Sequence, residues 1–169
     1  MRKSYLLLAA ILIYVLAVPC QSEALQEVSE PPKKWEYSVN IGYKNFKESG
    51  VKDSVFAGIR TQRRVVYPLL LGVGVEGAMI GDVVYGEINL PLSVRTTAGP
   101  VKADLLLRPG VAYAENSKTD VKKIIGVGTA GIEIKKFVSK GVAVGVGVYY
   151  SATTYSKLNN FSVGFAVTF

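Results

Sequence analysis

A two-residue alternation of apolar and polar side chains runs through most of this chain and restricts its fold more than any other feature. Successive side chains of a β-strand point to opposite faces of a sheet, so this period indicates strands whose two faces meet different surroundings. The last segment shows the pattern most clearly, with apolar side chains at Phe161, Val163, Phe165, Val167 and Phe169. Because no segment after residue 34 has a useful helical period, we expect an all-β fold.

The same alternation occurs in seven earlier segments, so the sequence predicts eight strands. Turn-like segments separate them at residues 47–53, 67–68, 81–82, 96–100, 115–120, 135–141 and 153–160. Strands of about 11 residues and these turns account for the whole of residues 34–169. We therefore expect a single domain there, without a second one.

The polar face of the predicted strands carries nearly balanced charge. Its six basic residues are Lys44, Arg60, Arg64, Arg95, Lys102 and Arg108. Its five acidic residues are Glu36, Glu76, Glu87, Asp104 and Glu133. Unpaired buried charge is costly, so this balance favours a polar network enclosed inside a barrel, with the apolar face turned outward to lipid. The sequence thus predicts an eight-stranded antiparallel up-and-down transmembrane β-barrel.

Aromatic residues near the predicted strand ends agree with that arrangement, because membrane barrels carry aromatic girdles at both interfaces. One rim is expected to hold Trp35, Tyr37, Tyr67, Phe137, Phe165 and Phe169. The other is expected to hold Tyr43, Phe46, Tyr85, Tyr113, Tyr150, Tyr155 and Phe161.

The first 24 residues have the organisation of a secretory signal peptide. Two basic residues precede an apolar run at 6–18, and small residues stand before the expected cleavage site after Ala24. The run has 13 residues, fewer than the roughly 20 that a spanning helix needs. We expect export of the chain, with residues 25–33 forming a short periplasmic lead before the barrel.

The last strand carries a recognisable pattern: Ser162, Gly164, Val167 and the aromatic Phe169 stand at polar, glycine, hydrophobic and aromatic positions. This segment resembles the C-terminal assembly signal of bacterial outer-membrane barrels, which the barrel-assembly machinery reads. In size and architecture the mature chain resembles the small eight-stranded barrels of the OmpX and OmpA transmembrane-domain type. The resemblance implies a monomer in the outer membrane of a Gram-negative cell envelope, in contact with lipid and lipopolysaccharide.

Residue types needed for common catalytic and metal sites are scarce. The chain has no His and one Cys, which excludes a Ser-His-Asp triad, a His-ligated metal and a thiolate zinc site. Glu76 and Glu87 are better explained as partners of inward arginines than as a catalytic pair. We therefore expect no enzyme, cofactor or metal. Despite a net charge of +7, the signal peptide argues against nucleic acid, and the Lys122–Lys123 and Lys135–Lys136 doublets are interpreted as rim residues near anionic headgroups.

Three places depart from the pattern. Pro91 and Pro109 fall inside predicted strands, where each removes a hydrogen-bond donor, so we expect bulges there. Thr61 and Arg63 fall on the lipid face of the second strand, which leaves its register open. Arg63 would have to lie near the interface and extend its charged group toward water.

Three roles remain open from the sequence. The first is a structural or surface protein whose barrel interior is closed by polar side chains. The second is a narrow transport barrel for small or apolar solutes, because inward Gly72, Gly74, Gly145, Gly147 and Gly164 leave some void. The third is surface adhesion, for which the predicted external loops are short. The sequence nominates no catalytic, cofactor-binding or metal-binding residue.

Overall fold

The computed structural model describes residues 35–46, 52–119 and 121–169. Its strands are β1 (Trp35–Phe46), β2 (Ser54–Val66), β3 (Leu69–Ile80), β4 (Val83–Asn89), β5 (Leu92–Ala98), β6 (Val101–Asn116), β7 (Val121–Ser139), β8 (Val142–Thr153) and β9 (Asn160–Thr168). A 3₁₀ turn, η2 (Ser156–Leu158), lies between β8 and β9. The predicted signal peptide and the lead at 25–33 lie outside the described residues.

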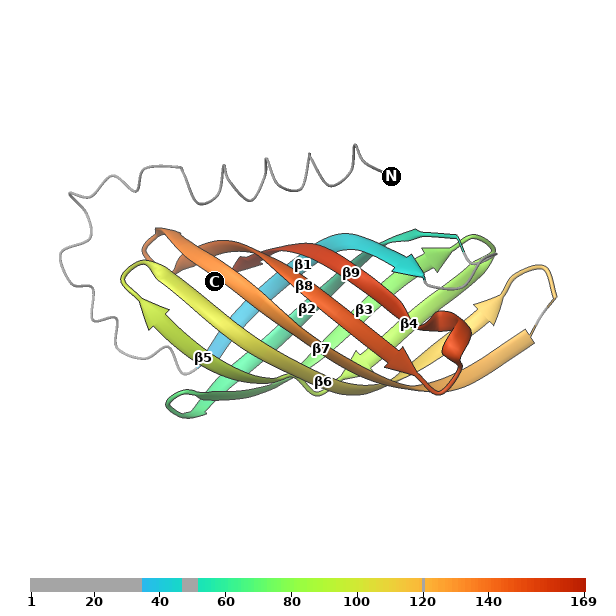
Figure 1. The fold of residues 1–169 in the computed structure, drawn as a ribbon, viewed down its shortest axis with the longest axis horizontal. Helices are drawn as coiled ribbons and strands as arrows, with labels where there is room; N and C mark the ends of the chain where they lie inside the picture. Colours follow the sequence, from blue (N-terminus) through green and yellow to red (C-terminus); the bar gives the residue numbers. More distant parts are fainter. Residues whose placement is uncertain (1–34, 47–51, 120) are drawn as a thin grey trace.

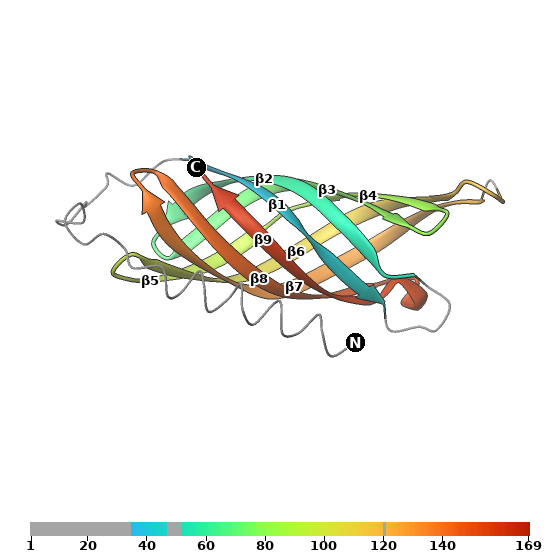
Figure 2. The same cartoon turned by 90° about the horizontal axis from the view of Figure 1, so that it is seen from above.

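The strands form one closed antiparallel ring (Figures 1 and 2). Apart from β4 and β5, which do not pair with each other, consecutive strands are hydrogen-bonded, and β1 closes the ring by pairing with β9 from Ser38↔Thr168 to Phe46↔Asn160. β4 and β5 share one position, since both lie between β3 and β6. The described residues therefore form the eight-position barrel that the alternation predicts.

Pro91 accounts for the division between β4 and β5. The ladder with β3 stops at Asn89 and resumes at Leu92 in the same register, so Pro91 interrupts the hydrogen bonding without the bulge expected there. Pro109, by contrast, causes no break in β6, so the bulge expected there is absent. The carbonyl of Pro109 accepts a hydrogen bond from Leu90 N at 2.9 Å. The nitrogen of Pro109, which has no hydrogen to donate, therefore faces the interruption that already lies between β4 and β5.

The two ends of the barrel differ in their connections. At one end, here called the turn end, lie the start of β1, the C-terminus and the turns at 67–68, 99–100 and 140–141. At the other, the loop end, lie the turn at 81–82, the projecting β6–β7 hairpin and η2 (Figure 1). Gly81 and Gly141 have φ of 61° and 79°, which suits glycine in such two-residue hairpin turns.

β6 and β7 are longer than the sequence predicts, with 16 and 19 residues. β7 continues to Ser139, so the turn expected at 135–141 is confined to its last two residues. Lys135 consequently belongs to the strand, and its side chain is 1% exposed inside the barrel. Its interpretation as a rim residue was wrong because the predicted turn began too early.

The outer face of the barrel is apolar, with exposed aliphatic or aromatic side chains on every strand. Examples are Val39, Ile59, Val75, Ile88 and Leu105, each 42–64% exposed. Two aromatic residues expected at the rim are instead inside: Phe46 and Tyr85 are 7% and 5% exposed. No helix in the described part of the chain has the length and apolar character to span a membrane.

Candidate functional site in the barrel interior

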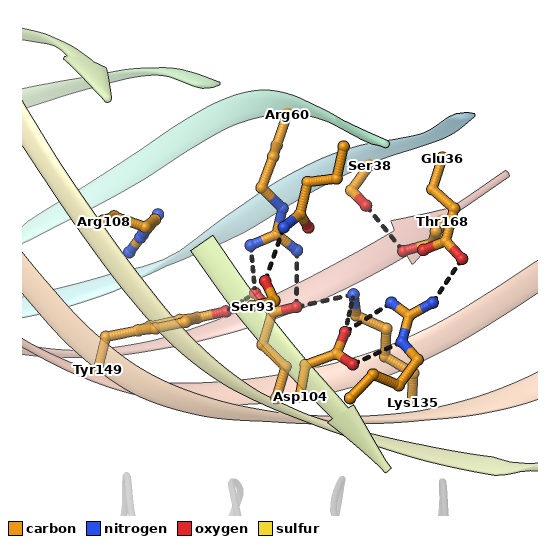
Figure 3. A network of polar contacts seen from close by, with 12 residues as sticks. Glu36, Ser38, Arg60, Ser93, Asp104, Arg108, Lys135, Tyr149 and Thr168 are labelled. Carbon is orange, nitrogen blue, oxygen red and sulfur yellow. Dashed lines mark hydrogen bonds and ion pairs between the residues drawn. The ribbon is translucent and has the colours of Figure 1, made fainter. Parts of the chain in front are cut away.

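The barrel interior nearest the turn end is filled by paired charges (Figure 3). Arg60 on β2 makes two hydrogen bonds to Glu133 on β7, at 2.8 and 2.6 Å. Lys135, two residues along β7, contacts Glu133 at 2.8 Å and Asp104 at 3.2 Å. Alternation along β7 places Glu133 and Lys135 on the same face, and the ring brings Arg60 across to them.

Arg95 on β5 extends this network to β1. Its guanidinium donates to both carboxylate oxygens of Asp104, at 2.6 and 2.8 Å, and to Glu36 at 2.5 Å. Lys102 also contacts Glu36, at 3.5 Å, while its ammonium lies 4.1 Å from the ring centroid of Phe137. Charges from five strand positions are thus mutually compensated, as a buried site requires.

A second ionic cluster lies farther along the barrel. Glu76 on β3 is paired with both Lys44 and Arg108, the latter at 3.3 Å. Arg108 lies 4.7 Å from the ring centroid of Tyr149, whose hydroxyl donates to Glu133 at 2.6 Å. Tyr149 therefore joins the two clusters into one continuous network.

Glu87 is directly opposite Glu76 in the β3–β4 register. It accepts hydrogen bonds from Tyr85 Oη at 2.7 Å and Asn89 Nδ2 at 2.8 Å. Glu76 is held by two cations, so the two carboxylates have different partners, and both are buried. In the described part of the chain, no three His, Cys, Asp or Glu side chains are placed to hold a metal ion.

The interior nearest the loop end is mainly apolar instead, although Ser54 and Asn160 are also buried there. Its buried cluster comprises Phe46, Phe56, Ala78, Ile80, Tyr85, Ala112, Ala114, Ile125, Val127 and Leu158. Leu158 belongs to η2, so the β8–β9 connection covers this end of the lumen. The sequence analysis did not predict this cluster. Its signal in the sequence is the apolar residues at inward positions, such as Phe56 and Ile125, which break the alternation.

The inward glycines lie beside larger side chains. Each lies against a neighbouring side chain: Gly72 against Gln62, Gly74 against Asn89, Gly145 against Lys135, Gly147 against Tyr149, and Gly164 against Phe56. A Cβ at Gly147 would lie 2.1 Å from the Tyr149 hydroxyl oxygen. Larger side chains therefore lie over these glycines and occupy the space beside them that the sequence predicts to be void.

The predicted interior residues largely converge. Lys44, Arg60, Glu76, Glu87, Arg95, Asp104, Arg108 and Glu133 are buried, and Lys102 is half-buried at the turn-end mouth. Arg64 departs from the prediction: it is half-buried and has no ion pair with another described residue. It lies beside a register shift near the end of β2, where the lumen meets solvent. Lys135 takes its place, so six cations still face five anions.

The predicted assembly-signal residues lie on β9 and directly after it. Ser162 and Gly164 face the interior, whereas Val167 and Phe169 face outward, and Phe169 is 49% exposed. Phe169 and Tyr37 exchange backbone hydrogen bonds of 2.8 and 3.2 Å, which fasten the final residue to β1.

Comparison with solved structures identifies similar folds. Neisserial surface protein A (NspA) matches with a TM-score of 0.63 and 13% identity, over 79% of this chain and 94% of that one. The N-terminal β-barrel domain of Pseudomonas aeruginosa OprF matches with a TM-score of 0.56 and 11% identity, over 79% and 96%. The outer membrane enzyme PagL matches with a TM-score of 0.51 and 12% identity, over 79% and 97%.

These likenesses establish the fold, which is that of the small eight-stranded outer-membrane β-barrels. No protein-family model matches the sequence, and neither does any curated protein. Because one fold can carry unrelated activities, the role of this chain has to be argued from its own interior and surface.

Proposed function

We propose that this protein is an integral outer-membrane barrel with a closed interior and a structural or surface role. The outward apolar face supports membrane insertion, since side chains such as Val39 and Leu105 are about half exposed and cover a barrel with no open sheet edge. The fold it shares with outer-membrane barrels agrees with this location.

The observation that carries the proposal is the filling of the lumen by two successive layers. The ionic network from Glu36 to Arg108 fills the part nearest the turn end, and the apolar cluster under Leu158 fills the part nearest the loop end. A hydrated ion would have to displace salt bridges in the first layer and enter an apolar interior in the second. A continuous water-filled channel is therefore not expected.

An enzymatic role is less well supported. PagL, an outer membrane enzyme, has the same fold, so the fold alone does not decide. The chain lacks His, the commonest general base. Its buried carboxylates are engaged by cations or by Tyr85 and Asn89. We propose that these groups stabilise the barrel rather than react.

The proposed orientation places the turn end in the periplasm and the loop end outside the cell. The expected partners are membrane lipid and lipopolysaccharide around a monomeric barrel. During assembly, the expected partner is the barrel-assembly machinery, which would read the C-terminal pattern ending at Phe169. Short turns at one end and longer connections at the other, as in outer-membrane barrels generally, support this orientation.

Planar-bilayer conductance tests the closed interior. Protein whose gel mobility changes on boiling, the sign of a folded barrel, should give no single-channel steps. Phe56→Ala and Phe161→Ala are matched variants, because Phe56 is 2% exposed inside and Phe161 is 46% exposed outside. Discrete channels in the unmodified protein, altered by Phe56→Ala but not by Phe161→Ala, would overturn the proposal and favour the narrow transport barrel.

A further inference from the structure

The lipid-facing side of β2 contains an exposed cation beside the single tryptophan of the chain. Arg63 and Trp35 are direct partners in the β1–β2 register, and the guanidinium carbon lies 5.8 Å from the indole ring centroid. Trp35 is 44% exposed, so both side chains lie on the outside of the barrel. This pair coincides with the place where Thr61 and Arg63 interrupt the apolar pattern.

The surroundings of Arg63 on the outer face are mainly apolar. Along β2, Thr61 separates Arg63 from Ile59, and Val65 follows it. Ile59 and Val65 are 60% and 59% exposed. Tyr37, 59% exposed, lies on the neighbouring strand. A lipid-facing charge is costly unless it lies at the interface and meets a counter-charge. Aromatic side chains beside Arg63 are typical of that interface.

Charge around the barrel is distributed unevenly between its ends. In the described residues of the turn-end half, the carboxylates Glu36, Asp104 and Glu133 all point inward and are paired. At the loop end, by contrast, Asp82 is exposed and Glu115 is half-buried, and they pair with Lys118 and Lys122 at 2.8 and 3.5 Å. The outer surface near Arg63 therefore presents this cation without an exposed carboxylate side chain of a described residue beside it.

We propose that Arg63 and Trp35 form a binding site for the phosphate headgroup of an anionic phospholipid in the leaflet at the turn end. The guanidinium would hold the phosphate, and Trp35 would fix the guanidinium at headgroup level by cation–π contact. This inference rests on the proposed membrane insertion and adds a specific lipid contact to it.

Quenching of Trp35 fluorescence by brominated lipid tests the site directly, because Trp35 is the only tryptophan. The barrel is placed in vesicles of phosphatidylglycerol and phosphatidylcholine, with bromine on one lipid or the other at equal mole fraction. Phosphatidylglycerol should be enriched about fivefold at Trp35, the effect expected for one interfacial cation. Raising the salt concentration should weaken this preference.

Arg64 supplies a matched control, since it is adjacent in sequence but belongs to the inward face of β2 and is half-buried. Arg63→Gln should reduce the phosphatidylglycerol preference to about unity, whereas Arg64→Gln, with the same change in charge, should retain it. Arg63→Lys should keep most of the preference. The mobility change on boiling verifies that each variant has folded.

The outcomes separate this inference from the proposed function. If neither brominated lipid quenches Trp35, membrane insertion of the barrel is itself wrong. If both lipids quench equally, the barrel is inserted but the headgroup site is refuted. If Arg63→Gln and Arg64→Gln reduce the preference equally, general positive charge explains it and the Arg63 site is also refuted.

Discussion

The two halves of the lumen are closed by opposite chemistry. Near the turn end, directional ion pairs such as Arg60–Glu133 fill the space, whereas near the loop end Phe56 and Ile125 fill it by contact alone. The ionic half needs each partner in place, because one missing group leaves a buried charge uncompensated. The apolar half tolerates imperfect geometry better but depends on volume.

The connections at the two ends parallel this difference. The turn end has two-residue turns, such as Lys140–Gly141, whereas the loop end has η2, which inserts Leu158 over the lumen. An apolar interior open to water would be costly, so the covered end holds the apolar cluster. At the turn-end mouth, Lys102 is half-buried and stays close to solvent.

The largest expected effect comes from the centre of the ionic half. Glu133→Gln leaves Arg60 and Lys135 without their shared carboxylate, so the free energy of unfolding should fall by about 3–5 kcal/mol. Denaturant unfolding in lipid vesicles, followed by Trp35 fluorescence, measures it. Glu115→Gln is the control: its partly exposed pair with Lys122 should contribute less than about 1 kcal/mol. Equal effects of the two substitutions would show that the network does not depend on charge.

The apolar half should respond to lost volume. Phe56→Ala removes a ring that is 2% exposed and should lower the free energy of unfolding by about 3 kcal/mol. The loss should be independent of pH, because the Lys44 ammonium, which lies 5.3 Å from the centroid of this ring, keeps its carboxylate partner Glu76. Unfolding curves at two pH values, with Phe161→Ala as the outward control, provide the measurement. A strongly pH-dependent loss would contradict the separation into two halves.

Glycine packing provides a smaller test of the ionic half. Gly147→Ala would force a methyl group toward Tyr149 and Glu133, at 2.1 and 2.9 Å, and should cost about 1–3 kcal/mol. Gly86→Ala is the matched control, because a Cβ there meets nothing within 4 Å. Unfolding midpoints of the two variants are compared. A neutral Gly147→Ala would mean that the space beside Tyr149 is open.

The smallest effect is expected at the loop end, outside the lumen. Burial favours the neutral form of Asp53, but hydrogen bonds from Tyr43, Phe46 N and Asn45 outweigh it and lower the pKa of Asp53 below 3.8. A lowered folded-state pKa means that the contacts of Asp53 with the end of β1 stabilise the fold above the unfolded-state pKa, and this contribution disappears as pH falls through the folded-state value. Asp53→Asn should remove this acid-dependent component of the free energy of unfolding, measured by denaturant unfolding across about pH 5 to 2. Identical acid profiles for the two proteins would contradict it.

Much of the fold follows from local sequence, because alternation is a property of each strand. Charged residues such as Arg60 and Glu133 are assigned to the interior because they alternate along their strands with outward apolar residues. Residues near predicted turns are harder to assign. Lys135 was missed and Arg64 was wrongly placed in the network, since a strand's last residues are defined by its pairing rather than by composition.

The amino-acid sequence by itself determined that the chain forms eight two-faced strands with balanced charge on one face. Tertiary structure decided which charges meet: Arg95 and Glu36 are 59 residues apart and become partners only through the closure and tilt of the ring. It also decided that Phe46 and Tyr85 lie inside and that Leu158 covers the lumen. Whether a side chain points inward or outward follows from its place in its own strand, which is local information. Its position along the barrel axis, by contrast, depends on the register of every strand around it.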